Sequence, residues 1–409
     1  MAEHAAPPRG LPAPATAPAT FLANAAAPGA AMTTLSALRK IVVLRALHLG
    51  DLLCAVPALR ALRQAAPHAE ITLIGLPWAA SFVRRFAHLV DHFLAFPGFP
   101  GLAERPFDVA AIPSFLNAVQ GQRFDLAIQL HGSGETSNVL AQLLGAAHCA
   151  GFHRPPQAPP AGSFLPWRAD EHEVRRCLRL MQMLGATARS EALEFPVSPA
   201  DVRLLQRSVD RLPAAGSYAV IHAGARLASR RWPTQRFAEV GSALAAAGMP
   251  VVLTGTAGEA GITRSIAARM GASALDLAGK TDLGALAVLV RDARIVVTND
   301  TGMSHIAAAL ATRSVVICSG ADPARFAPAD ATRHRVLAVP IACRPCLHAE
   351  CPIGHPCALA ISVEQVLQTV EAVLRDPGAS VQDQAPDQAP AAPRRTLRVA
   401  RMPDESDHA

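Results

Sequence analysis

Short apolar runs rich in β-branched residues alternate with Ala- and Leu-rich segments along most of the chain, and this alternation restricts the fold more than any other feature. Strands are expected at 40–45, 70–75, 124–130, 218–222, 251–254, 274–277, 295–298 and 314–318. Helices are expected at 52–65, 135–144, 172–184, 199–210, 234–247, 258–270, 282–291, 303–311 and 362–374. Apolar strands followed by helices indicate parallel sheets covered on both faces.

The alternation is interrupted at about 186–217, where three X-Pro pairs occur near a helical stretch: Phe195-Pro196, Ser198-Pro199 and Leu212-Pro213. A chain of 409 residues is long enough for two domains, each with its own core. We therefore predict an α/β protein with two doubly wound, Rossmann-like domains, at 39–195 and 196–361. Their cleft should lie at the carboxyl ends of the strands, where ligands bind in this class of fold.

Both ends of the chain have compositions that cannot build a core. Residues 1–31 are almost entirely Ala, Pro and Thr, and the far end repeats Asp-Gln-Ala-Pro at 383–386 and 387–390. We predict disordered tails at 1–38 and 376–409. No apolar stretch is long enough to span a membrane, and the N-terminus lacks the apolar core of a signal peptide, so a cytoplasmic protein is expected.

The charge distribution favours an anionic partner. The formal net charge is +6, but the C-terminal tail carries about −2, which leaves about +8 on the segment between the tails. Lys40 and Lys280 are the only lysines, so a site that needs a fixed cation will use Arg, whose planar donor fork suits phosphate oxygens. Aromatic residues make up 4%, too few for base stacking, so a nucleotide or an acidic lipid surface is favoured over nucleic acid.

Two turns that follow predicted strands carry acidic residues on the cleft side. Gly50 and Asp51 follow the first strand and begin a helix, where Asp51 could act in the cleft or simply cap the helix. Asp300, Thr301 and Gly302 follow a later strand, where the amides of the turn could form an anion site that suits a diphosphate, or Asp300 or Thr301 could simply cap the helix. His305 could reach the same anion or be an ordinary buried histidine.

Two further turns of the second domain contain candidate binding residues. The loop at 222–233 holds Arg226, Arg230 and Arg231, which could neutralise a leaving diphosphate without a metal or form a solvated basic loop. The turn at 254–259 ends in Glu259, which could accept hydrogen bonds from ribose hydroxyls or cap a helix.

Taken together in this order, the turns resemble glycosyltransferase family 9, the lipopolysaccharide heptosyltransferases. The resemblance runs from about Lys40 to Leu374 and is carried by three segments: Gly50-Asp51 with Pro57-Ala58-Leu59, Arg230-Arg231-Trp232-Pro233, and Asp300 to His305. It implies the GT-B fold, with the final helix at 362–375 bracing the first domain. It also implies inverting, metal-independent transfer, without a cofactor, from ADP-L-glycero-D-manno-heptose on the second domain to a lipopolysaccharide inner core on the first.

The resemblance assigns roles to individual residues. Asp51 is expected to be the catalytic base, Arg230 to replace the family's usual lysine at the diphosphate, and Glu259 to lie near the nucleoside. Asp300, Thr301, Gly302 and His305 are expected to bind the donor. Because the implied acceptor is lipid-anchored, peripheral contact with the cytoplasmic face of the anionic inner membrane is expected.

Four cysteines at 343–357 form the remaining cluster: Cys343, Cys346, Cys351 and Cys357. Thiolates this close could bind zinc, but the spacing is not one of the tight paired patterns, so reduced thiols or a disulfide remain alternatives and no metal ligand is assigned. A similar loop in the second-heptose branch of the family favours a heptosyltransferase II-like enzyme. Two other functions are left open: a GT-B transferase for a different nucleotide sugar, and a non-enzymatic basic binding protein.

Overall fold

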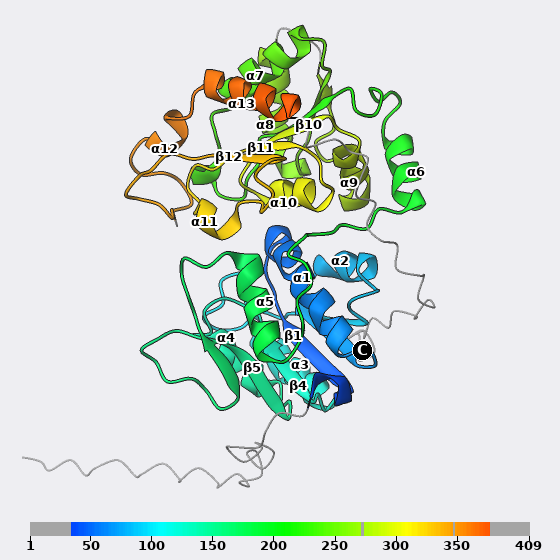
Figure 1. The fold of residues 1–409 in the computed structure, drawn as a ribbon, viewed down its shortest axis with the longest axis vertical. Helices are drawn as coiled ribbons and strands as arrows, with labels where there is room; N and C mark the ends of the chain where they lie inside the picture. The colour runs from blue at the N-terminus through cyan, green and yellow to red at the C-terminus, as the bar shows by residue number, and fades with distance from the viewer. Residues whose placement is uncertain (1–33, 271–273, 347, 377–409) are drawn as a thin grey trace, which may run out of the picture.

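Each of the two halves of the chain is built on a parallel six-stranded sheet (Figure 1). A computed structural model describes residues 34–270, 274–346 and 348–376. The first sheet has the strand order β3-β2-β1-β4-β5-β6, and the second has the order β12-β11-β10-β7-β8-β9. All strand pairs are parallel, which confirms the α/β, GT-B architecture expected from the sequence.

The strands predicted from the sequence are all present, and no end differs from the prediction by more than two residues. The first sheet consists of β1 Lys40–Leu44, β2 Glu70–Gly75, β3 His92–Ala95, β4 Leu126–Gln129, β5 His148–His153 and β6 Ser163–Pro166. The second consists of β7 Ala219–His222, β8 Val251–Leu253, β9 Leu275–Asp276, β10 Ile295–Asn299, β11 Ser314–Ile317 and β12 His334–Leu337. Four strands were not predicted (β3, β5, β6 and β12), because they lie toward sheet edges and their mixed burial gives no continuous apolar run.

Helices cover both sheets. Those of the first half are α1 Leu49–Ala65, α2 Ala79–Arg85, α3 Ala111–Gln120, α4 Ser137–Leu143 and α5 Glu173–Met183. Those of the second half are α6 Pro199–Ser208, α7 Thr234–Ala246, α8 Ala260–Arg269, α9 Leu283–Arg291, α10 Gly302–Ala309, α11 Pro323–Phe326, α12 Pro356–Leu359 and α13 Val363–Arg375. Short 3-10 turns lie at η1 Leu35–Ala37, η2 Ala228–Arg230 and η3 Ala257–Glu259.

The strand order places the predicted site residues at the switch point of each sheet. In the first sheet the order reverses between β1 and β4, and in the second between β7 and β10. In sheets of this type, ligands bind outside the carboxyl ends of the strands at such a point. Asp51 follows β1, Arg230 follows β7 and Asp300 follows β10, so all three lie beyond strands next to a switch point.

Two sequence-based expectations about the ends of the fold need correction. The expected N-terminal tail is too long, because Leu35 and Leu38 are buried in the same apolar cluster as α1. The last helix, α13, packs on α7, β11 and β12, and Val366 and Val370 are buried in the second core, so it belongs to the second domain and does not brace the first. The other residues of the expected tails, 1–33 and 377–409, lie outside the described residues.

The two halves meet where α1 packs against α10 (Figure 1). Leu52 of α1 and Ile306 of α10 belong to one continuous apolar cluster. Across the described ranges, we find no helix with the length and apolarity required to cross a bilayer.

Two shortened proteins test the corrected boundary, one starting at Met32 and one at Arg39. We expect the second to be less stable by about 3–6 kcal/mol, because burial of each of Leu35 and Leu38 contributes roughly 1.5–3 kcal/mol. Urea denaturation measures the difference. Equal unfolding free energies would show that 34–38 contributes nothing to the core.

Candidate active site between the two domains

Asp51 lies in the first turn of α1, at the end of the helix that faces the second domain. The N-cap residue is His48, and Asp51 completes a capping box with it, because Asp51 Oδ2 accepts a hydrogen bond of 3.3 Å from the His48 amide. Burial raises the pKa of the Asp51 carboxyl, while the positive charge of Arg45 opposes that rise. A carboxylate with a raised pKa has more proton affinity than an exposed one, as a general base requires.

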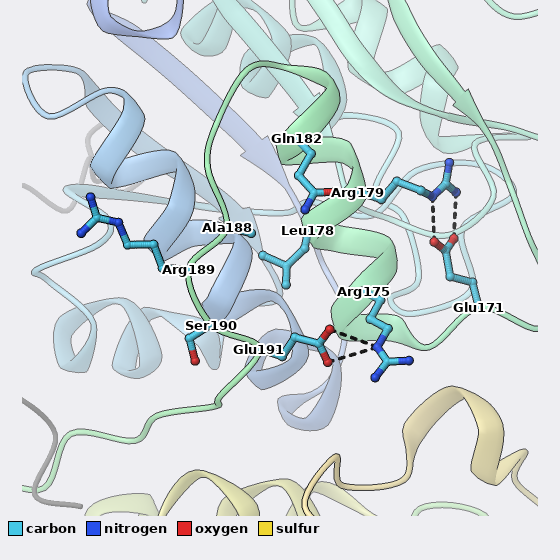
Figure 2. A pocket seen from close by; sticks show the side chains of 9 residues that line it. All are labelled: Glu171, Arg175, Leu178, Arg179, Gln182, Ala188, Arg189, Ser190 and Glu191. Carbon is cyan, nitrogen blue, oxygen red and sulfur yellow. Dashed lines mark hydrogen bonds and ion pairs between the residues drawn. The ribbon is translucent and has the colours of Figure 1, made fainter.

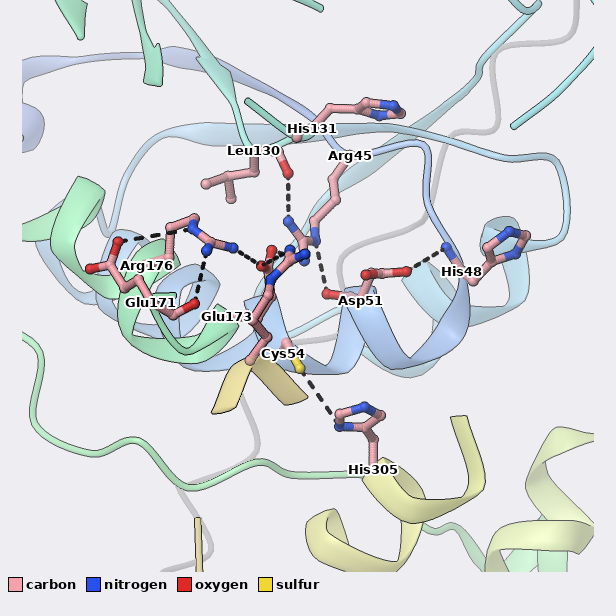
Figure 3. A network of polar contacts seen from close by, with 12 residues as sticks. Arg45, His48, Asp51, Cys54, Leu130, His131, Glu171, Glu173, Arg176 and His305 are labelled. Carbon is pink, nitrogen blue, oxygen red and sulfur yellow. Dashed lines mark hydrogen bonds and ion pairs between the residues drawn. The ribbon is translucent and has the colours of Figure 1, made fainter. Parts of the chain in front are cut away.

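Arg45, directly after β1, is the buried cation beside this turn (Figure 3). Its Nε donates a 2.8 Å hydrogen bond to the Asp51 carbonyl, and its Nη1 donates one of 2.5 Å to the Leu130 carbonyl. Its Nη2 forms a 3.0 Å ion pair with Glu173 at the start of α5. Arg45 therefore joins the ends of β1 and β4 to two helix starts.

The turn at Asp300 brings a second carboxylate to the start of α10. Thr301 is the N-cap of α10, and its Oγ1 accepts a 3.3 Å hydrogen bond from the Met303 amide. Burial raises the pKa of Asp300 to about 6, the positive charges of Arg230 and Arg344 oppose the rise, and the charge of Asp51 adds to it. Asp300 is thus within electrostatic range of Arg230 and Arg344 of its own domain and of Asp51 of the first domain.

Arg230 and Arg344 supply the positive charge at this turn. Arg230 ends η2, and Arg344 comes from the cysteine-containing loop, where its Nη2 donates to the carbonyls of Cys318 and Ser319 at 2.9 and 2.7 Å. The Nε atoms of both arginines are buried and have no hydrogen-bond partner within the described part of the chain. The protein's own acceptors therefore satisfy these two guanidinium groups only in part, and their positive charge acts on Asp300.

The loop at 343–357 folds over the segment that carries Arg230. The Ser229 amide donates to the Ala349 carbonyl at 3.0 Å, and the Ser229 hydroxyl donates to the His348 carbonyl at 2.6 Å. His355 Nε2 donates to the Ser229 carbonyl at 2.7 Å. All four thiols of the loop are free, and the described residues contain no group of three or more side chains arranged to hold a metal ion.

His305 lies on α10 and is buried against α1. Its Nδ1 is 3.6 Å from the Cys54 thiol, and burial lowers its pKa to about 4 (Figure 3). A Cβ atom at Gly50 would lie 2.7 Å from His305 Cδ2, so glycine is required for this close approach of the two helices. Of the two alternatives for His305, the geometry favours the buried, packed histidine over a side chain that reaches an anion.

Two further residues expected to bind the donor, Glu259 and Gly302, lie in different surroundings. Glu259 Oε2 accepts hydrogen bonds from the amide and hydroxyl of Thr256, at 2.8 and 2.9 Å, so it completes a helix cap. Its carboxylate also lies over Gly224, in the loop after β7, and is therefore on the cleft side of the sheet. Gly302 begins α10 and faces Leu49 of α1.

A hollow of about 420 Å³ lies beside α5 and the segment that follows it (Figure 2). Two of its arginines are already paired with carboxylates: Arg175 Nε with Glu191 at 3.1 Å, and Arg179 with Glu171 at 2.7 and 2.8 Å. At about 100° per residue, Arg175 and Arg179 point away from the side of α5 that carries Glu173. The hollow is therefore separate from the Asp51 site, and we assign it no function.

Three charged residues of this region were not predicted from the sequence: Arg45, Glu173 and Arg344. The sequence position of Arg45 could have indicated its role, because this residue directly follows an apolar strand and precedes the Gly-Asp turn. Arg344 lies between Cys343 and Cys346, in a segment whose spacing points to the thiols and carries no separate signal for a cation. Glu173 is 128 residues from Arg45, so no local pattern could have paired them.

Comparison with known proteins identifies the family. The sequence model described as glycosyltransferase family 9 (heptosyltransferase) matches residues 112–356, which is more than half of the chain. The chain belongs to glycosyltransferase family 9. It is accordingly a glycosyltransferase, as the resemblance implied.

Individual relatives agree with this assignment. Lipopolysaccharide heptosyltransferase 1 of Escherichia coli K12 is 24% identical over 306 residues, which cover 69% of this chain and 89% of that protein. Lipopolysaccharide heptosyltransferase 2 of the same strain is 31% identical over 151 residues, 36% of this chain and 43% of that protein. The structure of the E. coli ADP-heptose lps heptosyltransferase II superposes with a TM-score of 0.65 at 20% identity, covering 82% of this chain and 98% of that one.

The raised pKa of Asp300 predicts how stability depends on pH. Because its carboxyl has a pKa of about 6 in the folded protein and about 3.8 in the unfolded chain, the folded state holds the proton more tightly. Wild-type stability relative to Asp300→Asn should therefore fall by roughly 3 kcal/mol in total as pH rises from about 3 to 7, with most of the fall between about pH 4 and 6. Urea denaturation of both proteins across this range measures the change. A stability difference that does not change with pH would show that the pKa of Asp300 is not raised in the folded protein.

Proposed function

We propose that this protein transfers heptose from ADP-L-glycero-D-manno-heptose to the inner core of lipopolysaccharide, with inversion at the anomeric carbon and without a metal. The observation that carries the proposal is the placement of Asp51 beside the Asp300 turn, where Arg230 and Arg344 supply positive charge. Family membership supports heptose as the transferred sugar, and the names of the relatives, a lipopolysaccharide heptosyltransferase and an ADP-heptose lps heptosyltransferase, support the donor and the acceptor.

In the proposed reaction, Asp51 accepts the proton of an acceptor hydroxyl. The hydroxyl oxygen bonds to the anomeric carbon of the heptose on the face opposite the diphosphate. The bond from that carbon to the diphosphate oxygen breaks, and the electron pair leaves with ADP. General-base assistance of this kind contributes roughly 10²–10⁴ in rate.

The departing diphosphate gains negative charge, which the second domain is equipped to stabilise. Arg230 and Arg344 have buried, unpartnered Nε donors within the described residues, and the start of α10 at Thr301 and Gly302 adds backbone amides. We propose that Glu259 contacts the nucleoside from its place over Gly224. His305 is buried against α1, so we assign it to the contact between the domains.

Replacement of the proposed base tests the mechanism. Asp51→Asn should bind ADP with a Kd within about twofold of wild type and lose at least about a hundredfold in turnover, because the amide cannot accept the proton. ADP release and calorimetry measure the two quantities. Asp210→Asn, at an exposed acid after α6, serves as the control. Near-normal turnover of Asp51→Asn would exclude Asp51 as the base.

A lipid-anchored acceptor requires the enzyme to work at a membrane surface. We propose peripheral contact with the cytoplasmic face of the inner membrane, favoured by the net charge of about +8 between the predicted tails. Each cation near an anionic surface contributes on the order of 1 kcal/mol. The protein should sediment with anionic vesicles at low salt and be released at high salt. Sedimentation that does not change with salt would contradict an electrostatic contact.

A further inference from the structure

Glu173 is a buried carboxylate surrounded by three guanidinium groups, which we term the Glu173 cluster: Glu173, Arg45, Arg176 and Arg325. Glu173 Oε1 pairs with Arg45 at 3.0 Å, while Oε2 pairs with Arg176 and lies 3.6 Å from Arg325 Nη2. Arg45 and Arg176 come from the first domain, but Arg325 lies on α11 of the second. The cluster therefore spans the boundary between the domains.

A neighbouring hydrogen bond crosses the same boundary. His172, the N-cap of α5, donates from Nε2 to the Ala327 carbonyl at 2.8 Å, directly after α11. Arg325 also lies over the ring of Trp167 in the first domain, with its guanidinium carbon 5.9 Å from the ring centroid. The contact between α11 and the start of α5 is thus specific, and it places Arg325 beside Glu173.

The cluster reaches Asp51 through Arg45. The Arg45 guanidinium bonds at once to Glu173 and to the Asp51 carbonyl, at 3.0 and 2.8 Å (Figure 3). A shift of Glu173 would therefore move the group that fixes the first turn of α1. We propose that Glu173, Arg45 and Arg325 act as positioning residues, which set the place and charge environment of Asp51 when the domains are in contact. The inference rests on the function proposed above.

The charges around Asp51 determine whether the loss of each neighbour would raise or lower the pKa of its carboxyl. Arg45, at the end of β1, lowers the pKa of Asp51, and Glu173, on α5, raises it. His48 at the start of α1 lowers it, and Asp51 also interacts with Asp300 of the second domain. The other titratable groups that interact with Asp51 are the thiols of Cys54 and Cys177 on α1 and α5, whose raised pKa values keep them neutral.

Arg325 affects Asp51 through Glu173. While Arg325 is in place, it offsets part of the Glu173 charge, which leaves more of the Arg45 charge to stabilise the Asp51 carboxylate. Removal of the Arg325 charge alone, with the domains still in contact, would therefore make Asp51 hold its proton more tightly.

The test is the pH dependence of turnover, measured by ADP release. We compare the acidic limb of the profile, which is the pH range over which turnover falls as Asp51 becomes protonated. Arg45→Gln should move the limb to higher pH by about one unit, and Glu173→Gln should move it to lower pH. Arg45→Lys keeps the charge, so its limb should stay near wild type even if its rate falls. A purely structural role would lower the rate without these opposite shifts.

Arg325→Gln keeps the inference testable if a buried variant does not fold, because the Arg325 side chain is 27% exposed. It should move the limb upward by a few tenths of a unit. Arg175→Gln, on α5 but paired with Glu191, is the matched control and should leave the limb in place.

The inference would be overturned if the acidic limb of Arg45→Gln or of Arg325→Gln did not move. It would also be overturned if Arg45→Gln and Glu173→Gln moved the limb in the same direction. Failure of the proposed function has a different signature, because Asp51→Asn would then remain active.

Discussion

The packing of α1 against α10 is the contact on which the arrangement of the site depends. Each helix begins directly after a switch-point strand, and the two starts meet where Gly50 leaves room for His305. A helix start carries unsatisfied amides and a partial positive charge. Because two such starts converge, this region favours anions from both domains at once. Asp51 and Asp300 are placed on these starts, so the same contact sets the distance between them.

Burial at this contact determines the chemistry of both carboxylates. Removal from water raises the pKa of each, and the arginines around them limit the rise. The arginines are not equivalent, however. Arg45 is fixed by three hydrogen-bonded partners, whereas Arg230 and Arg344 keep a buried donor unpaired within the described residues. Arg45 therefore holds groups of the protein in place, whereas Arg230 and Arg344 supply positive charge at the Asp300 turn.

Much of the fold and part of the site could be predicted from the sequence, for reasons that particular residues illustrate. The apolar runs of β1 and β10 are buried on both faces of parallel sheets, so each appears in the sequence as a continuous apolar run, and the turns after them placed Asp51 and Asp300. The burial of His305 depends on Gly50 of the other domain, and the pairing of Glu173 with Arg45 joins distant elements. The predicted position of α13 on the first domain was wrong. The amphipathic pattern of this helix shows that one face is buried, but it does not show which domain covers that face.

The attachment of α13 to the second core has a consequence for how the two domains can move and recombine. Since residues 343–376 stay with the second domain, the described chain passes between the domains only once, in the segment between α5 and α6. A single covalent crossing leaves rotation of the domains to be resisted by side-chain contacts alone. It also makes the second domain, with its own last helix, a unit that gene fusion could exchange between relatives if the apolar packing of α1 on α10 is kept.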